Sequence, residues 1–597
     1  MPLRLPSKRR SDGDGGRASK KGNGNKEPTY DTYDEAMDGG VLNEEKGERY
    51  RDGDKAQRFY EKAAELYQKA MQFDENSYDA MYNLARVQYR LASEFLLPPS
   101  NMDLYSSAMA LYNRALQGSD SPYFKSDAAF NLAQAFSAVA DITDEYQGPD
   151  GAQNARELRV AATQLMGPVL TTQIIGVEML SDKKDDDAAS EAAAAHTETG
   201  TTSTAAVPEQ EEIDVDGEDT KTEREEVNVS VEKAPTPDAL VDTTLFLVDI
   251  GTTLWDSVTP PQPPSEGEQQ AMREMLDMAS RLGPPGRQAE IDLANIKVLL
   301  TLDSIMWDMF RAQAQPGSGV ERGCESAAKV LERLLESLGA SPPDDTTVKA
   351  DILATLANTE VAGAQRYVTL AKRSPTPAPL AQSAWALLSS ATQHLAAAAD
   401  LPVTLNTPKE FRPNCYIELA KVTLDRARLA PYNDTAAHNV QQLFDNCSAY
   451  AGKAAAALGW NFPRLPTAST TTPFFTDDLS PPYPAGWDME MLSRTLALLL
   501  LRICFFAIHG GVLKTEGAEV LYEHAAKSVV DAIISVSSGP RRLMPKDIAR
   551  FVGDIEDEEG GVCDAEVQWW EQVRQGILRG LPPAEAAATE AQPSGAQ

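Results

Sequence analysis

The chain has little cysteine and little histidine, and neither residue type is grouped. The five cysteines include no Cys-x-x-Cys pair, so the sequence predicts neither a zinc ribbon nor a disulfide framework. The five histidines show no His-Glu-x-x-His spacing, and the chain has no Walker loop, Gly-x-Gly-x-x-Gly turn, calcium loop or Gly-x-Ser-x-Gly elbow. These absences favour a protein that is not an enzyme and that uses no cofactor and no metal.

Positive charge is also scarce, because 55 lysines and arginines face 89 aspartates and glutamates and give a formal net charge of −34. Binding to phosphates needs a basic surface, so the charge argues against a direct nucleic-acid partner. The acidity suits either a basic protein client or simple solubility. No signal peptide is recognised, so we expect a reducing compartment.

Long hydrophobic runs are missing. The most apolar stretch, Leu496 to Ile508, is too short to span a bilayer and contains Arg502. We therefore expect a buried helix there and no membrane role.

Sustained alternation of apolar and polar residues is absent too, so no strand is predicted. Apolar residues recur instead at helical spacing, and proline or glycine separates many of the segments. Thr236-Pro237-Asp238 has the residues of a helix start: a hydroxyl cap, a proline and an acidic first turn. We expect an all-α chain with helices over 54–73, 78–92, 103–117, 125–141, 152–170, 236–256, 266–283, 287–311, 320–339, 346–373, 378–400, 413–430, 434–459, 487–509, 516–537 and 563–580.

Small and aromatic residues repeat in the first of these helices. The spacing Ala-x3-Tyr-x2-Ala occurs twice, and a Leu-Ala pair opens two further helical patterns. Small residues let two helices approach closely, and an aromatic ring fills the groove between helix pairs. The residues expected to pack the repeats are Ala63, Tyr67, Ala70, Leu84, Ala85, Ala108, Tyr112, Ala115, Leu132, Ala133 and Phe136.

This pattern resembles the tetratricopeptide repeat (TPR) family, whose unit is about 34 residues long. The resemblance is clear over about 55–140 and becomes degenerate after 236, where Leu356-Ala357 precedes another small-residue pattern. It implies a TPR-like α-α superhelix, interrupted here by an acidic insert. It also implies that the concave face binds a peptide, with Asn83 and Asn131 on the peptide backbone and, as neighbouring groove candidates, Arg86, Tyr89 and Gln134. The alternative for the two asparagines is a hydrogen bond between helices.

Some family members grip the C-terminal carboxylate of a heat-shock chaperone with lysine and arginine beside asparagine. Asn83 matches one such asparagine. However, Asp127 and Asn131 stand where the basic residues are needed, and Glu48 stands where another asparagine is expected. An acidic group at these positions repels a carboxylate, and a neutral group cannot form an ion pair with it. The residues therefore argue against a chaperone clamp.

Composition divides the chain into five parts. The acidic part is either a spacer or an electrostatic arm for a basic partner, because it cannot bury enough apolar area to fold. The expected parts are a disordered basic N-terminal tail (1–40), TPR-like repeats (41–180), an acidic low-complexity disordered insert (181–235), a second TPR-like array (236–580) and a disordered tail (581–597).

Two basic clusters in the N-terminal tail resemble a bipartite nuclear import signal, although an ordinary basic tail has the same residues. The clusters are Lys8, Arg9 and Arg10, and Lys20 and Lys21. We therefore expect the protein in the nucleus and the cytoplasm.

The sequence as a whole predicts a non-enzymatic scaffold or adaptor that binds another protein in a concave groove. A narrower version is an escort chaperone for a highly basic client such as a ribosomal protein or histone, with strongly salt-dependent binding. The alternative is a regulatory or structural subunit of a larger nuclear or cytoplasmic complex, held by apolar helix faces.

Overall fold

The computed structural model describes residues 30–50, 53–96, 98, 100–147, 150–195, 235–311, 319, 322–340, 346–403, 407–408, 410–458, 490–509, 518–535, 545–559 and 563–580. Within these ranges all regular structure is helical, and no strand occurs. The predicted all-α class is therefore confirmed. Residues 1–29 of the predicted N-terminal tail, 196–234 of the predicted acidic insert and the predicted tail 581–597 lie outside the described residues. Residues 181–195, predicted to begin the disordered insert, continue a helix instead.

The N-terminal part of the structure consists of paired helices that pack on their neighbours in sequence order. Helix α3 begins at a serine cap, where the Ser77 hydroxyl accepts a hydrogen bond from the backbone N–H of Ala80 at 3.2 Å. The helices are α1 (Tyr33–Tyr50), α2 (Gly53–Phe73), α3 (Tyr78–Arg90, continued by a π-helical turn, Leu91–Phe95), α4 (Met102–Gly118), α5 (Pro122–Gln147) and α6 (Ala152–Ala195).

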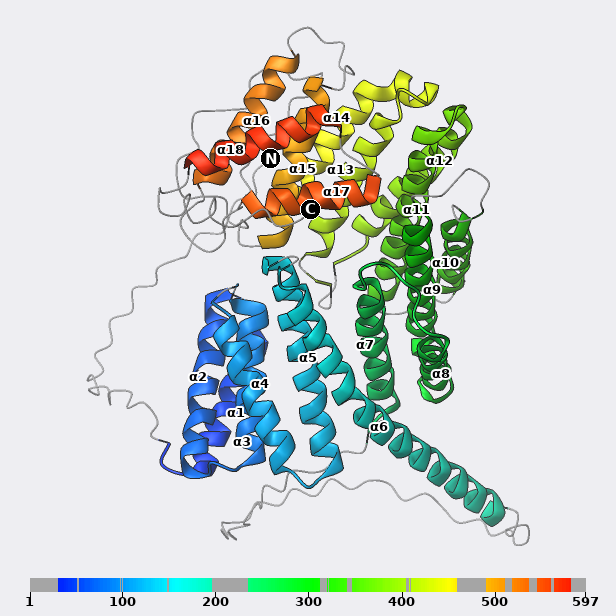
Figure 1. Cartoon of the computed structure of the whole chain (residues 1–597). Coiled ribbons are helices and arrows are strands. Elements are labelled where there is room, and N and C mark those ends of the chain that lie inside the picture. Colours follow the sequence, from blue (N-terminus) through cyan, green and yellow to red (C-terminus); the bar gives the residue numbers. More distant parts are fainter. Residues whose placement is uncertain are drawn as a thin grey trace, which may run out of the picture.

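The rest of the chain continues the same pairing (Figure 1). The cap predicted at Thr236 is confirmed, since its hydroxyl accepts from the backbone N–H of Ala239 and Pro237 begins the helix. The helices are α7 (Pro237–Asp256), α8 (Glu266–Leu282), a 3-10 turn (Pro285–Arg287), α9 (Gln288–Phe310), α10 (Gly323–Ala340), α11 (Thr347–Arg373), α12 (Pro377–Ala399), α13 (Phe411–Arg428), α14 (Asp434–Ala457), α15 (Glu490–His509), α16 (Ala518–Ser535), α17 (Pro545–Glu559) and α18 (Asp564–Gly580).

Two of these helices were not predicted. Helix α1 begins at Tyr33, inside the stretch expected to be a disordered tail, and α17 was not expected at all. The composition of residues 1–40 predicted disorder, but two glycines of α1 lie where tyrosine rings of α2 pack on the α1 backbone. A Cβ atom at Gly40 would lie 2.5 Å from the ring of Tyr67, and one at Gly47 would lie 2.8 Å from the ring of Tyr60.

The residues expected to pack the repeats lie in the hydrophobic core between the helices. All of them are buried except Phe136, which is partly buried and packs against two clusters. Tyr67 and Tyr112 are fully buried, each from the second helix of a pair. The small residues beside them leave room for the ring, as the spacing requires.

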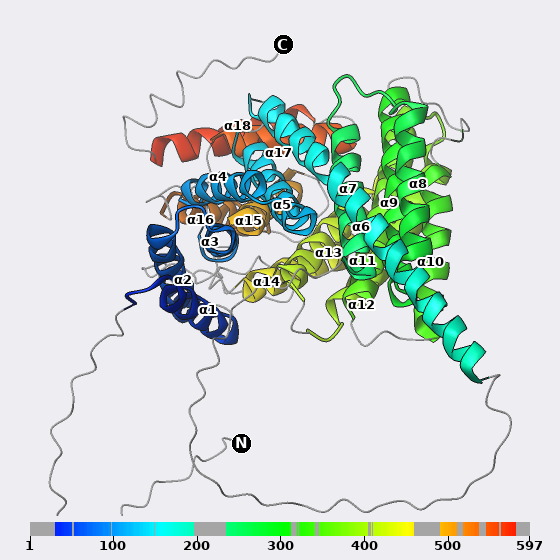
Figure 2. The ribbon, with the colours of Figure 1, turned by 90° about the horizontal axis from the view of Figure 1, so that it is seen from below.

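The superhelix curves back on itself, so that α15 to α18 lie above the N-terminal helices in Figure 1, and the view from below shows the same return (Figure 2). Arg494 of α15 forms an ion pair with Glu145 of α5. Arg550 of α17 donates to the backbone carbonyl oxygens of Asp144 and Glu145, at 3.0 and 2.8 Å. These contacts join the last helices to α5, more than 340 residues earlier in the chain.

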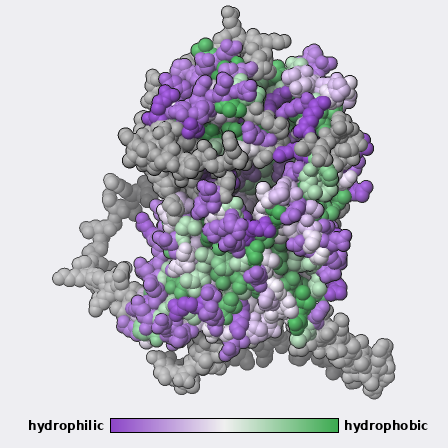
Figure 3. Space-filling view, in the orientation of Figure 1, coloured by the Kyte–Doolittle hydropathy of each residue, from purple (hydrophilic) through white to green (hydrophobic). Residues whose placement is uncertain are grey.

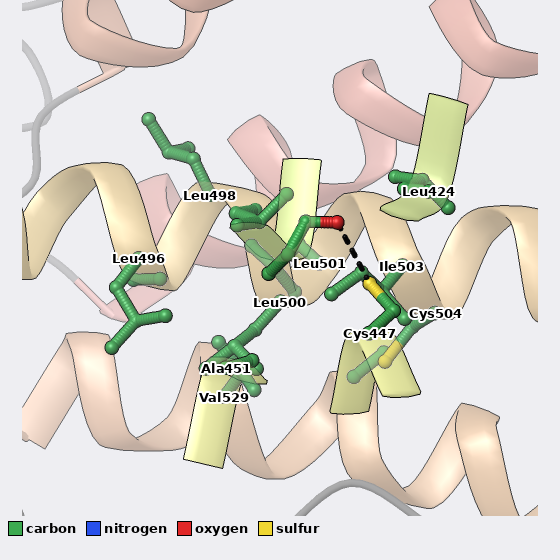
Figure 4. Close-up of a cluster of buried hydrophobic side chains, with 14 of the residues drawn as sticks. Leu424, Cys447, Ala451, Leu496, Leu498, Leu500, Leu501, Ile503, Cys504 and Val529 are labelled. Atoms are coloured by element: carbon green, nitrogen blue, oxygen red, sulfur yellow. Dashed lines mark hydrogen bonds between the residues drawn. The ribbon is translucent and has the colours of Figure 1, made fainter. Parts of the chain in front are cut away.

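The apolar run in α15 is a buried helix, as expected. Its side chains from Leu496 to Leu501 pack with α13, α14 and α16 in the largest core cluster, where the thiols of Cys447 and Cys504 also lie (Figure 4). Arg502 interrupts the run and pairs with Glu566 of α18 at 2.9 Å. Of the described helices, only α6 contains a stretch long and apolar enough to cross a bilayer, Ala152–Met179, of which 33% is buried. This helix packs against α5 and α7.

Candidate functional site on the concave face

We call the side of the superhelix formed by the first helix of each pair its inner side, and in the N-terminal part a ladder of ion pairs joins two of these helices. Glu44 and Glu48 of α1 lie opposite Arg86 and Arg90 of α3, with N–O distances of 2.7 and 3.4 Å. Glu44 also accepts a hydrogen bond from the Tyr67 hydroxyl at 2.9 Å. Both partners repeat at i and i+4, so the ladder runs along the two helices.

The protein's own contacts already use several of the predicted groove residues. Arg86 is held in the ladder, and the ring of Tyr89 packs edge-on against Tyr105 at 5.6 Å. Asn131 donates to the Tyr82 hydroxyl at 2.9 Å, so it makes the hydrogen bond between helices that was the alternative to ligand binding. Asn83 and Gln134 are half-buried, and their groove role stays a prediction.

A larger hollow continues along the inner side between α7, α9 and α11. Its volume is about 640 Å³, and hydroxyl, amide and charged side chains line much of it. Several of the threonine hydroxyls donate to backbone carbonyl oxygens in the preceding turn of their own helix. The lining includes Thr252, Thr253, Asp256, Lys297, Thr301, Ser304, Cys324, Thr355, Asn358, Thr359, Ala362 and Arg366.

A second hollow of about 360 Å³ extends the first between α11, α13, α15 and α17. The two hollows share Asn358 and Ala362, so they form one groove along the inner side; we call it the concave groove. Its floor in this part alternates apolar side chains such as Val422 and Leu499 with polar ones such as Gln365.

Sequence reasoning missed Asn358, although a signal was present. In the N-terminal repeats an asparagine precedes the Leu-Ala pair, whereas here it follows Leu356-Ala357. Leu356 and Ala357 are completely buried in α11, so the next residue turns to the groove. The Leu-Ala pair therefore marks the buried face, and the neighbouring asparagine on either side can face the groove.

The concave groove has a rigid basic anchor in its floor. Arg366 is 4% exposed, pairs with Asp303 at 2.7 Å, and lies over the ring of Trp307 at 5.3 Å. Asp303 also accepts a bond from the Cys324 thiol at 3.5 Å, and burial raises the pKa of that thiol to about 12. A thiol with this pKa stays protonated at neutral pH and is a poor nucleophile.

Asp79, Asp127 and Asp256 form no ion pair among the described residues, and Asp256 lines the larger hollow. The side chains of Asp127 and Asp256 are exposed. Burial alone raises the pKa of Asp79, Asp127 and Asp256 above its ordinary value. Burial also raises the pKa of Asp141, and the nearby charge of Asp249 adds to the effect, against the opposing bond from Arg159.

A separate hollow lies on another side of the molecule, between α6, α7 and α8. It has a volume of about 640 Å³ and is lined by apolar side chains that include Val160, Leu254, Trp255, Met272 and Met275. The face seen in Figure 3 is polar over much of its area, with an apolar region low in the centre, where α5, α6 and α7 lie in Figure 1. No set of three or more metal-ligating side chains is found in the described part of the chain.

Comparisons with known proteins place the chain in no family. No family model matches it, and no curated protein matches it. Among solved structures, a circular tandem repeat protein with novel repeat topology is 11% identical, covers 94% of this chain and 98% of its own, and has a TM-score of 0.23. The match to the structure of Naa15/Naa10 bound to HypK-THB has 12% sequence identity and a TM-score of 0.18, and it covers 94% of this chain and 92% of that chain. Scores this low transfer no function to this chain.

Proposed function

We propose that this protein is a tetratricopeptide-type scaffold, without catalytic activity, that binds an extended segment of another protein in its concave groove. The observation that carries the proposal is the groove itself, which runs across α7, α9, α11, α13 and α15. A ligand lying along it contacts several repeats at once, which is how solenoids hold extended partners. Asn358 lies where the two hollows meet and can bond a peptide backbone through its amide.

The carboxyl groups of the inner side support a basic partner. Asp127 and Asp256 come from different repeats, and neither forms an ion pair among the described residues. A lysine or arginine of the partner would form ion pairs with these exposed carboxylates. The formal net charge of −34 would draw such a partner in over a longer range. We therefore propose an escort for a strongly basic client, with nuclear entry directed by the basic clusters at 8–10 and 20–21.

The groove proposal is tested by comparing two double variants of the full chain. Asp256→Asn with Asn358→Ala alters the groove, while Asp277→Asn with Asn439→Ala makes the same changes on exposed sites of α8 and α14. We expect the groove variant alone to lose at least about tenfold in affinity for the basic protein that copurifies with the wild type, measured by titration at fixed salt. Equal affinity for both variants would reject the groove.

A salt gradient separates the escort from its alternative. Binding by charge weakens steeply between low and high ionic strength, since exposed charges farther apart than about 8 Å are screened at physiological salt. The alternative, a structural subunit of a larger complex, is favoured by the apolar hollow between α6, α7 and α8. A partner set that survives high salt, and that is lost on Val160→Asp rather than on Asp256→Asn, would favour the subunit.

A further inference from the structure

Helix α13 packs against α12 on one side and α14 on the other, and both of these are second helices of their pairs (Figure 1). Arg426 of α13 lies over the ring of Trp385 of α12, with 4.4 Å between the guanidinium carbon and the ring centre. Its side chain lines neither hollow of the concave groove. Arg426 is half-buried, and its Nε atom is buried without a hydrogen-bond partner among the described residues.

The charge of Arg426 is therefore held partly out of water. Among the buried side-chain polar atoms that lack a partner in the described part of the chain, only this Nε belongs to a charged group. Burial lowers the pKa of Arg426, against a smaller opposing effect of Tyr450. Arginine nevertheless stays protonated in proteins, and a buried charge without a partner is costly. A charged group shifted by burial in this way is a candidate for ligand binding.

A second cation lies next to the same tyrosine. The ammonium nitrogen of Lys453 is 5.4 Å from the centre of the Tyr450 ring and 5.5 Å from that of Tyr416. Lys453 is exposed and forms no ion pair within the described ranges. The three rings pack partly buried against the core, so they are fixed in place. We call Arg426 and Lys453, with the rings of Trp385, Tyr416 and Tyr450, the outer cationic site.

The three helices supply no carboxylate to this site. Helix α12 contains neither aspartate nor glutamate. Glu418 and Asp425 of α13 pair with basic residues of their own helix and line the concave groove. On α14, Asp434 stands at the helix start, and Asp445 lies close enough to Tyr522 of α16 to raise its pKa. The negative charge that would balance Arg426 and Lys453 is thus missing from the helices that surround them.

We propose that the outer cationic site binds a short acidic segment of a partner protein, in which apolar residues separate the carboxylates. One carboxylate accepts hydrogen bonds from the guanidinium of Arg426, which the ring of Trp385 holds in one plane. A second carboxylate pairs with Lys453, and the intervening apolar side chains pack on the half-buried rings. The site is separate from the concave groove, so the chain would join an acidic partner on one side to a basic partner on the other.

The charge of the whole chain limits the ligand to a short one. A nucleic acid would carry its phosphates beyond the site and over a protein with a formal net charge of −34, where they are repelled. A short acidic peptide ends within the site and meets only the two cations.

The test titrates the full-length protein at low salt with a hexapeptide of alternating glutamate and valine, which carries an uncharged dye for fluorescence anisotropy. Arg426→Met with Lys453→Met removes both cations. Arg58→Met with Lys55→Met is the matched control, because both side chains are exposed on α2 and Lys55 also lies over a tyrosine ring, at 3.7 Å.

We expect the site variant to bind the peptide at least about tenfold more weakly than the wild type and the control. A peptide with glutamine in place of glutamate should not bind. Equal affinities of the site variant and the control, or no binding to the wild type, would overturn the proposal. If the double variant folds poorly, Lys453→Met alone changes only an exposed side chain and should still weaken binding by at least about threefold.

Thermal unfolding separates a ligand site from a packing role. Removing a buried charge that has no partner should leave Tm unchanged or raise it, so Arg426→Met should not lower Tm. Saturating peptide should raise the Tm of the wild type and leave that of the variant unchanged. A lower Tm for Arg426→Met with unaltered peptide affinity would show that Arg426 only packs on Trp385, and the proposal would be wrong.

Two competition measurements complete the test. Inorganic phosphate should displace the peptide only at much higher concentration than unlabelled peptide does, because it cannot contact the rings. Displacement at a lower concentration would identify a phosphate site and reject the acidic segment. The groove variant, Asp256→Asn with Asn358→Ala, should bind the peptide as the wild type does, so the outer site and the concave groove can fail independently.

Discussion

At the scale of single residues, the glycines of α1 decide how closely two helices approach. Tyr67 is completely buried and its hydroxyl is bonded to Glu44, so its ring cannot move away from the α1 backbone. The ring lies where a side chain at Gly40 would begin. Helix propensity alone disfavours glycine here by about 1 kcal/mol relative to alanine, and the close packing outweighs that preference.

Gly40→Ala should therefore lower the stability of the protein by about 1–3 kcal/mol, the usual result of overpacking a core. Gly452→Ala in α14 is the matched control, because a Cβ atom there meets nothing within 4 Å. The control should be neutral or stabilise by up to about 1 kcal/mol. Urea unfolding followed by circular dichroism measures both, and a neutral Gly40→Ala would contradict the packing described for α1.

Residue-scale electrostatics also predict a pH effect at His394. Its ring nitrogen lies 2.9 Å from Glu360, which is 3% exposed, and this hydrogen bond raises the pKa of the histidine against the opposing effect of burial. The charged histidine is therefore favoured in the folded state. The stabilisation is fully present below the unfolded pKa of about 6.5 and is lost as pH rises through the higher folded pKa.

The stability difference between the wild type and His394→Gln should accordingly shrink as pH rises from 6 toward alkaline values. Thermal unfolding at a series of pH values gives this difference, and the shift in the histidine pKa is checked by NMR titration of its ring protons. A difference that stays constant across the range would show that Glu360 does not stabilise the charged ring.

At the scale of the element, α18 is attached to α15 by a buried ion pair. Arg502 and Glu566 have side chains that are 9% and 3% exposed and meet at 2.9 Å. Removing one partner leaves the other charge buried without compensation, which typically costs about 3–5 kcal/mol. Removing both with apolar residues of similar size is often close to neutral.

Arg502→Leu should thus destabilise the protein by about 3–5 kcal/mol, and Arg502→Leu with Glu566→Leu should recover most of that loss. Denaturant unfolding of the two single variants and the double variant gives the coupling energy. If the double variant loses as much free energy of unfolding as the two single variants lose together, the two side chains are not coupled.

Elements differ in how far the sequence predicts them. The spacing of alanine and tyrosine predicted the N-terminal helix pairs. A small residue at helical spacing from an aromatic ring leaves room for that ring between two helices, so the spacing alone indicates the packing. Helix α1 was missed because the partner of its glycines is a ring on another helix. Helix α17 was missed because its apolar face is only three residues long. The groove around Asn358 was missed because it is formed by helices more than 100 residues apart, and a repeat pattern does not give their mutual placement.

At the scale of the whole molecule, the contacts of Arg494 and Arg550 hold the last helices of the superhelix against α5 of the N-terminal part. These contacts are polar and partly exposed, so salt and charge-removing substitutions should weaken them.

Arg494→Gln with Arg550→Gln should open the superhelix, and small-angle scattering should record a larger radius of gyration. The matched control is Arg574→Gln, which breaks the exposed pair with Glu571 inside α18. An unchanged radius in the double variant would mean that the ends stay together by other contacts.

The return of the last helices to α5 also changes how the molecule loses its structure. A linear array of repeats frays from its free ends, because a terminal repeat has only one neighbour to hold it. Here α15 and α17 also contact α5, so the C-terminal end of the array has a second neighbour and should fray less readily. Damage to the first repeats should therefore reach the last ones directly, and the array should melt with fewer separate steps than its length suggests.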